Sequence, residues 1–283
     1  MKLAIAKIFV AVVVFPLAGA LIRGFDRKLT ARMQGRMGPP VLQPIYDIVK
    51  LFRKDPIILN RQQVVFAWLH LAFMALSCIM LVMGRDGLML LFILAFSTLF
   101  LVMGGMCVRS PFSRIGSQRE ILLMLAYEPV LVLMIVCFYR INGSFDIQSV
   151  LDKPLPLLPE LPLVFAAFLP VLVIKLQKSP FDLATSHHAH QEIVKGLTIE
   201  FSGPVLGIVE IAHCYETVYF LALIGLFWAT NAWVAAALMA AALFVTIVAD
   251  NMLARLSMRW TFQFMGFFAF ALAVTNFIWL YWN

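Results

Sequence analysis

The chain alternates between long apolar runs and short polar connections. Each apolar run has about 20 residues, the length that an α-helix needs to cross roughly 30 Å of hydrocarbon. The runs lack the strict alternation of a barrel strand, and a helix satisfies its own backbone hydrogen bonds in lipid. The pattern therefore predicts an all-α polytopic membrane protein with about eight transmembrane helices. The predicted spans are 3–23, 62–84, 88–108, 119–140, 161–178, 204–228, 230–249 and 260–281.

A shorter amphipathic helix is predicted directly after the first span. The sequence Gly38-Pro39-Pro40 interrupts the helical pattern, because a residue before proline is pushed away from helical geometry. Apolar side chains then recur at helical spacing with charged side chains on the opposite side. Such a helix either rests on lipid headgroups or forms a docking surface for a partner, and its spacing is compatible with both. The apolar residues are Ile45, Ile48, Val49 and Phe52, and the charged ones are Asp47, Lys50 and Lys54.

The composition excludes a soluble globular domain, because 63% of the residues are hydrophobic, only 13% are charged and the mean hydropathy is +0.93. The segments after the first, third, fifth and seventh spans, together with the span ends that border them, hold 17 of the 22 Lys and Arg residues. Cytoplasmic loops are rich in these residues, so we expect cytoplasmic loops at about 24–61, 109–118, 179–203 and 250–259. Both termini are then outside a cytoplasmic (inner) membrane. Residues 1–283 are expected to form a single integral membrane domain, and the charge of +7 does not indicate nucleic acid.

The sequence predicts no metal site in this chain. The four cysteines have no CxxC spacing and lie in or near the spans, as buried free thiols do. His187, His188 and His190 fall within four residues, but neither a cysteine nor a fourth ligand follows at a fitting spacing. We therefore expect a solvated or partner-facing loop here, with a proton relay as the lesser alternative.

Ionisable residues inside the apolar runs are the strongest functional signal. Glu128 lies midway along the fourth span, while Glu210, His213 and Glu216 lie in the sixth. A charge at the bilayer centre costs several kcal/mol, so these side chains should face the bundle interior or water. They form either an internal ion pair that fixes helix packing or a path for protons or ions. Asp250, at the end of the seventh span, is expected to pair with Arg255 or with the loops.

Two polar segments carry a resemblance to one family. DRKLTARMQGRMGPPVLQPIYDIVKL resembles the first cytoplasmic segment of subunit 1 (also called the H subunit) of respiratory complex I and of homologous membrane subunits in energy-converting [NiFe] hydrogenases. PFDL at 180–183 and EFSG at 200–203 resemble a later family loop, and HHAHQE looks like the membrane-embedded B subunit of the Ech-type hydrogenases. The absence of extra residues between GP and LQP also favours the hydrogenase branch.

The resemblance implies a non-catalytic subunit that docks a cytoplasmic hydrogenase module and links H2 evolution to the movement of H+ or Na+. The implied partners are the large and small hydrogenase subunits, a ferredoxin-like iron–sulfur subunit, an antiporter-like membrane subunit and the lipid bilayer. The NiFe centre and iron–sulfur clusters are expected in those partners. The expected coupling residues are Glu128, Glu192, Glu200, Glu210, His213, Glu216 and Asp250. The expected docking residues are Asp26, Arg27, Arg32, Arg36, Gln43, Asp47, Lys50, Asp182, His187, His188 and His190.

Two other functions stay open at this point. The first is the quinone-site subunit of a complex I-type oxidoreductase, but Lys175 stands where complex I members often carry an acid. The second is a stand-alone ion transporter, which often shows inverted repeats. Residues 1–140 and 141–283 show no convincing repeat, which counts against the transporter.

Overall fold

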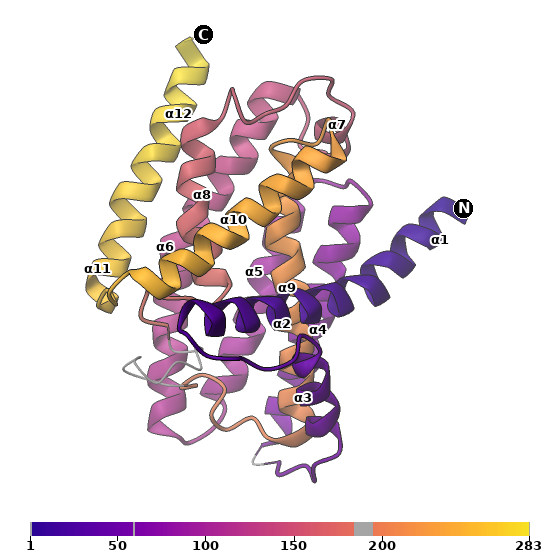
Figure 1. Ribbon diagram of the computed structural model, residues 1–283, viewed down its shortest axis with the longest axis vertical. Helices are drawn as coiled ribbons and strands as arrows, with labels where there is room; N and C mark the ends of the chain where they lie inside the picture. The colour runs from indigo at the N-terminus through magenta and orange to yellow at the C-terminus, as the bar shows by residue number, and fades with distance from the viewer. Residues whose placement is uncertain (1, 59, 184–194, 283) are drawn as a thin grey trace. The chain divides into compact units, whose positions relative to one another are not determined.

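The structure, a computed structural model, describes residues 2–58, 60–183 and 195–282 and is helical along most of this length (Figure 1). This confirms the all-α prediction. The elements are α1 (Lys2–Phe9), η1 (Val10–Val14), α2 (Phe15–Met33), α3 (Gln43–Phe52), α4 (Arg61–Val82), α5 (Gly87–Met106), α6 (Pro111–Asn142), α7 (Ile147–Leu151), α8 (Pro162–Lys175), α9 (Gly203–Leu226), α10 (Ala232–Met252), α11 (Met258–Gln263), η2 (Phe264–Ala269) and α12 (Phe270–Trp282).

Seven helical stretches in the described part of the chain are long and apolar enough to cross a membrane. They confirm seven of the predicted spans. The run at 161–178 differs, because it forms the 14-residue helix α8. At 1.5 Å per residue, α8 is roughly 21 Å long and shorter than a bilayer core. Pro162 starts this helix, and the positive φ of 58° at Gln177 follows its end.

Two predicted loops are partly helical. The first transmembrane stretch runs from Ala4 to Met33, so α2 carries its helix ten residues into the predicted loop at 24–61. Helix α6 begins at Pro111 and absorbs most of the loop expected at 109–118. In both cases the helix continues through charged residues, because a change in polarity does not itself end a helix. The amphipathic helix is confirmed as α3.

The residues divide into two compact units, each described below by itself. Unit 1 comprises 1–79, 93–121 and 183–218, and unit 2 comprises 80–92, 122–182 and 219–283. Helices α4, α5, α6 and α9 contribute one part to each unit. The single membrane domain expected from the sequence stays a prediction.

In unit 1, the first long helix packs closely against α9. A Cβ atom at Gly19 would lie 2.0 Å from the carbonyl oxygen of Cys214, so only glycine allows this approach. The Tyr215 hydroxyl donates a 2.6 Å hydrogen bond to the carbonyl oxygen of Val12. Val12 lies in the π-helical stretch η1, where the regular helical pairing changes. These contacts bring α9 to the helix that precedes the charged segment.

In unit 2, α8 is held by polar contacts at both ends. The Asn276 side chain, fully buried on α12, accepts hydrogen bonds from the backbone N–H groups of Leu163 and Val164 at 2.9 and 3.1 Å. It also donates to the carbonyl oxygen of Glu160 at 3.1 Å. The first N–H groups of a helix have no partner within the helix, so Asn276 satisfies two of them. Beyond the other end of α8, Lys178 forms a buried ion pair that is described with the site.

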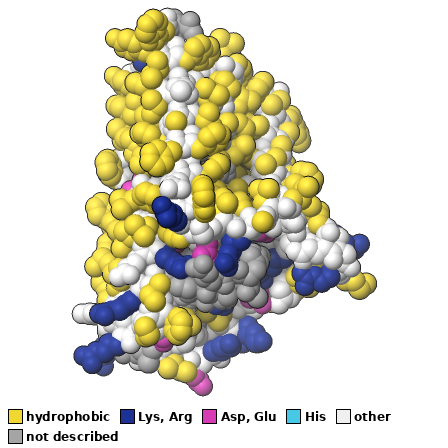
Figure 2. All heavy atoms as spheres, turned by 90° about the vertical axis from the view of Figure 1, so that its left-hand side faces the viewer, with side chains coloured by type: hydrophobic (Ala, Val, Ile, Leu, Met, Phe, Trp, Pro, Cys, Tyr) yellow, Lys and Arg dark blue, Asp and Glu magenta, His cyan; other side chains and the backbone are white. Residues whose placement is uncertain are grey.

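One face of the molecule shows apolar and charged side chains in separate areas. On the face drawn in Figure 2, hydrophobic side chains cover the upper part, and Lys and Arg gather in the lower part. Among the most exposed large apolar residues are Ile5, Phe9, Trp233, Phe267 and Trp282. Exposure of so many large apolar side chains is expected when lipid is the surrounding solvent.

Candidate functional site

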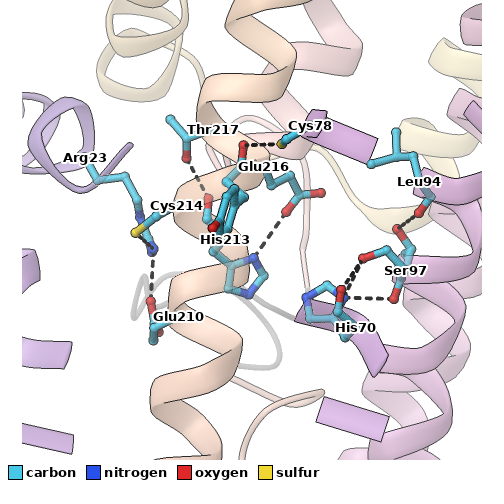
Figure 3. A network of polar contacts seen from close by, with 12 residues as sticks. Arg23, His70, Cys78, Leu94, Ser97, Glu210, His213, Cys214, Glu216 and Thr217 are labelled. Carbon is cyan, nitrogen blue, oxygen red and sulfur yellow. Dashed lines mark hydrogen bonds and ion pairs between the residues drawn. The ribbon is translucent and has the colours of Figure 1, made fainter. Parts of the chain in front are cut away.

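Helix α9 carries the main group of polar side chains inside the membrane-spanning part of unit 1 (Figure 3). It is the least apolar of the seven candidate spans in the described part of the chain. Glu210, His213 and Glu216 follow one another at intervals of three residues, so they project from one broad side of the helix. Polar groups at this depth need partners, because lipid offers none.

Glu210 pairs with Arg23 of α2. Arg23 Nη1 lies 3.0 Å from Glu210 Oε2, and each side chain is only 16% exposed. The same nitrogen lies 3.9 Å from Cys214 Sγ, one helical turn further along α9. An ion pair in this setting is stable only when both partners are present, because either charge alone bears its full desolvation cost.

His213 pairs with Glu216 of the same helix. His213 Nδ1 lies 3.2 Å from Glu216 Oε2, and both side chains are largely buried. The carbonyl oxygen of His213 accepts a 2.9 Å hydrogen bond from the Thr217 hydroxyl. The sequence placed Glu210 and His213 on a shared face, but the two residues bind separate partners in the structure. Of the two alternatives that the sequence left open, the structure shows paired side chains at both positions, and the path for protons or ions stays a prediction.

A second histidine lies beside His213. The rings of His70 and His213 have centroids 6.1 Å apart and planes at 66°. His70 Nδ1 lies 2.8 Å from the carbonyl oxygen of Ser97 and 2.9 Å from its hydroxyl. The Ser97 hydroxyl in turn donates to the carbonyl oxygen of His70 at 2.9 Å. Helices α4 and α5 thus share a separate polar cluster, whose His70 ring lies next to the His213 ring of α9 (Figure 3).

The charged segment after the first span folds back onto α2. A Cβ atom at Gly24 would lie 1.8 Å from the carbonyl oxygen of Val41, so glycine is required at this crossing. Arg27 Nη1 lies 3.0 Å from Asp47 Oδ2, and Gln43 Nε2 donates to Asp47 Oδ1 at 2.9 Å. These contacts fix α3 against the end of α2.

The remaining predicted docking residues of this segment lie near the surface. Asp26 is half-buried and its carboxylate accepts from the Thr30 hydroxyl at 3.4 Å. Arg32, Arg36 and Lys50 are exposed. Arg36 lies beyond the end of α2. The helix stops at Met33, and Gly35 follows with a φ of +70°.

In unit 2, Glu128 is half-buried on α6 and interacts electrostatically with Lys175. The Lys175 ammonium lies 4.4 Å from the centre of the Tyr127 ring and 5.6 Å from that of Phe220. Lysine here is 7% exposed, and an aromatic face stabilises a desolvated cation. Lys175, the residue that departs from the complex I pattern, is thus buried in unit 2 and interacts with Glu128.

Asp250 anchors the segment that follows α8. Its Oδ2 lies 3.3 Å from Lys178 Nζ, and its Oδ1 accepts a 2.8 Å hydrogen bond from the backbone N–H of Ser179. Both charged side chains are about 5% exposed. Of the two expected partners for Asp250, the structure shows the loop. Nearby, Asp182 is fully buried. Its expected docking role stays a prediction.

Several predicted residues lie outside the described part of the chain, namely Glu192, His187, His188 and His190. Glu200 is described and is half-buried in the turn before α9. Among the described residues, no group of three His, Cys, Asp or Glu side chains is placed to hold a metal ion.

Comparison with known proteins decides the family. The sequence pattern of the family described as NADH dehydrogenase matches residues 6–281, nearly the whole chain. The chain belongs to the NADH dehydrogenase subunit 1/H family. This family member is a multi-pass membrane subunit of a complex I-like or hydrogenase-type complex.

Relatives of this subunit 1/H family member come from both branches. Hydrogenase-4 component C of Escherichia coli (strain K12) is 29% identical over 223 residues, 70% of this chain and 69% of the relative. Formate hydrogenlyase subunit 4 of the same organism is 32% identical over 220 residues, covering 71% and 69%. The H subunit of NADH-quinone oxidoreductase from Thermomicrobium roseum is 30% identical over 224 residues, covering 65% of each chain.

The fold of this family member is also found in a solved complex. A chain of the membrane-bound sulfane sulfur reductase, an archaeal respiratory membrane complex, superposes with a TM-score of 0.86. The match covers 98% of this chain and 99% of the other at 21% identity. At 21% identity, this similarity shows a shared fold.

Sequence reasoning on this family member missed Arg23 and His70. Arg23 is the last residue of the predicted first span, 3–23, and was not singled out. His70 stands within QQVVFAWLHLAFMAL and was not singled out. An ionisable residue inside a span is itself a functional signal, so both residues could have been identified as candidates from the sequence. Their pairing with residues about 140 to 190 positions away is visible only in the fold.

Proposed function

We propose that this chain is the membrane-anchor and coupling subunit of an energy-converting hydrogenase complex. In this role it docks the large and small hydrogenase subunits and a ferredoxin-like iron–sulfur subunit, and it adjoins an antiporter-like membrane subunit. The NiFe centre and iron–sulfur clusters belong to those partners. The relatives named hydrogenase-4 component C and formate hydrogenlyase subunit 4 support this branch of the family.

The observation that carries the coupling role is the buried network on α9. Arg23–Glu210 and His213–Glu216 place four ionisable groups within the membrane-spanning helices of unit 1. Such groups are costly in a bilayer and are found where protons or ions move. A carboxylate that gains or loses its countercharge changes its proton affinity, so a shift of charge at one pair is passed on as a change in protonation.

The docking role rests on the segment from α2 to α3. Its basic residues Arg32, Arg36 and Lys50 are exposed, and the chain before α3 packs closely on α2 at Gly24. An exposed surface of fixed geometry with a positive charge suits a soluble acidic partner. The asymmetry of Lys and Arg along the chain supports a position of this segment on the cytoplasmic side of the inner membrane, with the termini outside.

The experiment that tests the function is purification of the native complex from membranes in a mild detergent. Co-purifying chains are identified by mass spectrometry, nickel is measured, and H2 evolution is assayed from a reduced one-electron donor. We expect a nickel-containing hydrogenase module with H2 evolution. The complex reconstituted into vesicles should then move H+ or Na+ when H2 forms, and ionophores specific for each ion identify which one.

Two other results would overturn the proposal. A quinone-reducing complex without nickel would place the chain in the complex I branch, which the 30% identity to the H subunit of an NADH-quinone oxidoreductase makes the second candidate. A chain that purifies alone and transports ions would show a stand-alone transporter.

A further inference from the structure

Helix α3 presents apolar and basic side chains together on its exposed side. We propose that this side lies in the headgroup region of the membrane and binds anionic phospholipids, whose phosphate groups pair with Lys50 and Arg53. The sequence pattern alone is compatible with lipid or with a protein partner, and the contacts of α3 favour lipid. The proposal goes beyond the proposed function and does not depend on the hydrogenase role.

The orientation of α3 leaves apolar side chains outside. Asp47 and Gln43 face α2, because the Asp47 carboxylate lies 3.0 Å from Arg27 and accepts a 2.9 Å hydrogen bond from Gln43. Tyr46 and Val49 are exposed on another side of the helix. A helix that rests on a protein in water directs its apolar residues to the protein and its polar residues outward. The exposed side of α3 is therefore expected to contact an apolar layer.

The contacts at both ends of α3 place it where spanning helices leave the apolar layer. Just before α3, the carbonyl oxygen of Val41 packs on Gly24, which directly follows the predicted span 3–23. At the other end, Phe52 packs on α9, and a Cβ atom at Gly207 would lie 3.0 Å from its ring (Figure 1). Gly207 lies near the start of α9, which is itself a candidate span. Such a position is typical of a helix in the membrane interface.

The chain after α3 continues with exposed apolar side chains. Ile57 and Ile58 are exposed, and α4 begins at Arg61. Within α4, which is a candidate span, Val65 and Trp68 are also exposed. The exposed apolar residues of this part of unit 1 thus lead from α3 into a helix whose surrounding solvent is lipid.

Two basic residues lie next to the exposed apolar ones. Lys50 follows Tyr46 by four residues and Arg53 follows Val49 by four, so each cation lies about one helical turn from an apolar side chain. Both basic side chains are exposed. Their apolar stems can lie along the acyl boundary while the charges reach the headgroups. An anionic lipid gains from such cations, and a guanidinium can form two hydrogen bonds with its phosphate.

The lipid-binding side of α3 differs from the proposed docking surface, although Lys50 belongs to both. Tyr46, Val49 and Arg53 belong to the lipid-binding side alone. An acidic soluble partner matches the cations, but it would place Tyr46 and Val49 against a polar surface. A phospholipid offers a phosphate and an acyl chain together, so it matches both kinds of side chain.

The proposal is tested by photo-crosslinking of the full chain in lipid nanodiscs. Benzoylphenylalanine replaces Tyr46 in one variant and Trp68 in a control variant, because both residues are aromatic and 56% exposed. The discs contain phosphatidylcholine and phosphatidylglycerol with identical acyl chains in a known ratio, and mass spectrometry identifies the adducts. At position 46 we expect phosphatidylglycerol adducts to be enriched roughly fivefold or more over the disc composition. At position 68 the adducts should follow the disc composition.

Charge variants identify the residues that hold the headgroup. Arg53→Gln should lower the enrichment at position 46 roughly fivefold, and Lys50→Gln combined with Arg53→Gln should abolish it. High salt should lower it as well, because it screens exposed charges. Both residues are exposed, so the variants should fold as the wild type does. Arg140→Gln removes an equal charge from an exposed position in the last turn of α6 and should leave the enrichment unchanged.

Three results would overturn the proposal. Adducts at position 46 that follow the disc composition would show ordinary contact with lipid and no anionic site. Lipid adducts at position 68 together with none at position 46 would show that this side of α3 lies in water. In native membranes, a crosslink from position 46 to a protein chain would show that a partner covers it. Each of these results leaves the hydrogenase role standing, because that role is measured by nickel content and H2 evolution.

Discussion

Arg23 Nη1 lies 3.0 Å from Glu210 Oε2 and ties the first membrane-spanning helix of the chain to α9. The two residues are 187 positions apart and both are largely buried. Arg23 stands three residues before Asp26, the first of the residues expected to dock a partner. The helix that leads into the docking segment is therefore anchored directly to the helix that carries the buried acids.

Removal of one partner of this pair should destabilise the chain. Glu210→Gln leaves the Arg23 guanidinium without its carboxylate, at an expected cost of about 3–5 kcal/mol in the free energy of unfolding. The double variant Arg23→Met with Glu210→Leu should recover most of that loss, because it removes both charges. The measurement is unfolding in detergent or lipid, arranged as a double-mutant cycle.

The matched control for that cycle is the more exposed pair Lys153–Glu160, with 3.5 Å between Nζ and Oε1. Glu160→Gln should cost less than about 1 kcal/mol, because exposed ion pairs contribute little. Equal losses for Glu210→Gln and Glu160→Gln would contradict the view that Arg23 depends on Glu210.

Glu128→Gln should separate chemistry from ion movement. The amide keeps the shape of the side chain but holds no negative charge beside Lys175. We expect the complex to assemble and evolve H2, while ion movement per H2 falls by a factor on the order of 100, as for loss of a proton-transfer group. Asp152→Asn, at an exposed position, is the control. Normal ion movement in an assembled Glu128→Gln complex would exclude this residue from coupling.

Gly19 should tolerate no side chain. The Cβ atom of Gly19→Ala would lie 2.0 Å from a backbone oxygen of α9, and backbone has little freedom to move aside. We expect a loss of at least about 3 kcal/mol in the free energy of unfolding, or failure to assemble. Gly266→Ala is the matched control, because a Cβ atom there has nothing within 4 Å. Wild-type melting of the Gly19 variant would show that the two helices separate readily.

Asn276 should matter more than its neighbour Thr275. Asn276→Ala leaves two backbone N–H groups at the start of α8 without their acceptor and should cost about 2–3 kcal/mol. Thr275 is exposed and its hydroxyl donates to a carbonyl oxygen of its own helix, so Thr275→Ala should cost less than about 0.5 kcal/mol. Hydrogen exchange at Leu163 and Val164 localises the effect. Unchanged protection there would remove the capping role.

The sequence alone determined the fold class, most of the spans and the amphipathic helix α3. Apolar runs of helical length leave a chain in lipid little alternative to helices, since each backbone group must find its partner within its own segment. The same reasoning located Glu128, Glu210, His213 and Glu216, because a charge inside an apolar run stands out along the sequence. It overestimated the length of α8, which starts at Pro162 and ends before the turn at Gln177.

Only the tertiary structure decided which groups are partners. Arg23 with Glu210, His70 with His213, and Lys178 with Asp250 are each more than 70 positions apart. Hydrophobic periodicity predicts which side of a helix is buried. It does not predict which other helix covers that side. The pairing follows from helix packing, which depends on close approaches such as Gly19 against Cys214 and on the summed contacts of many side chains.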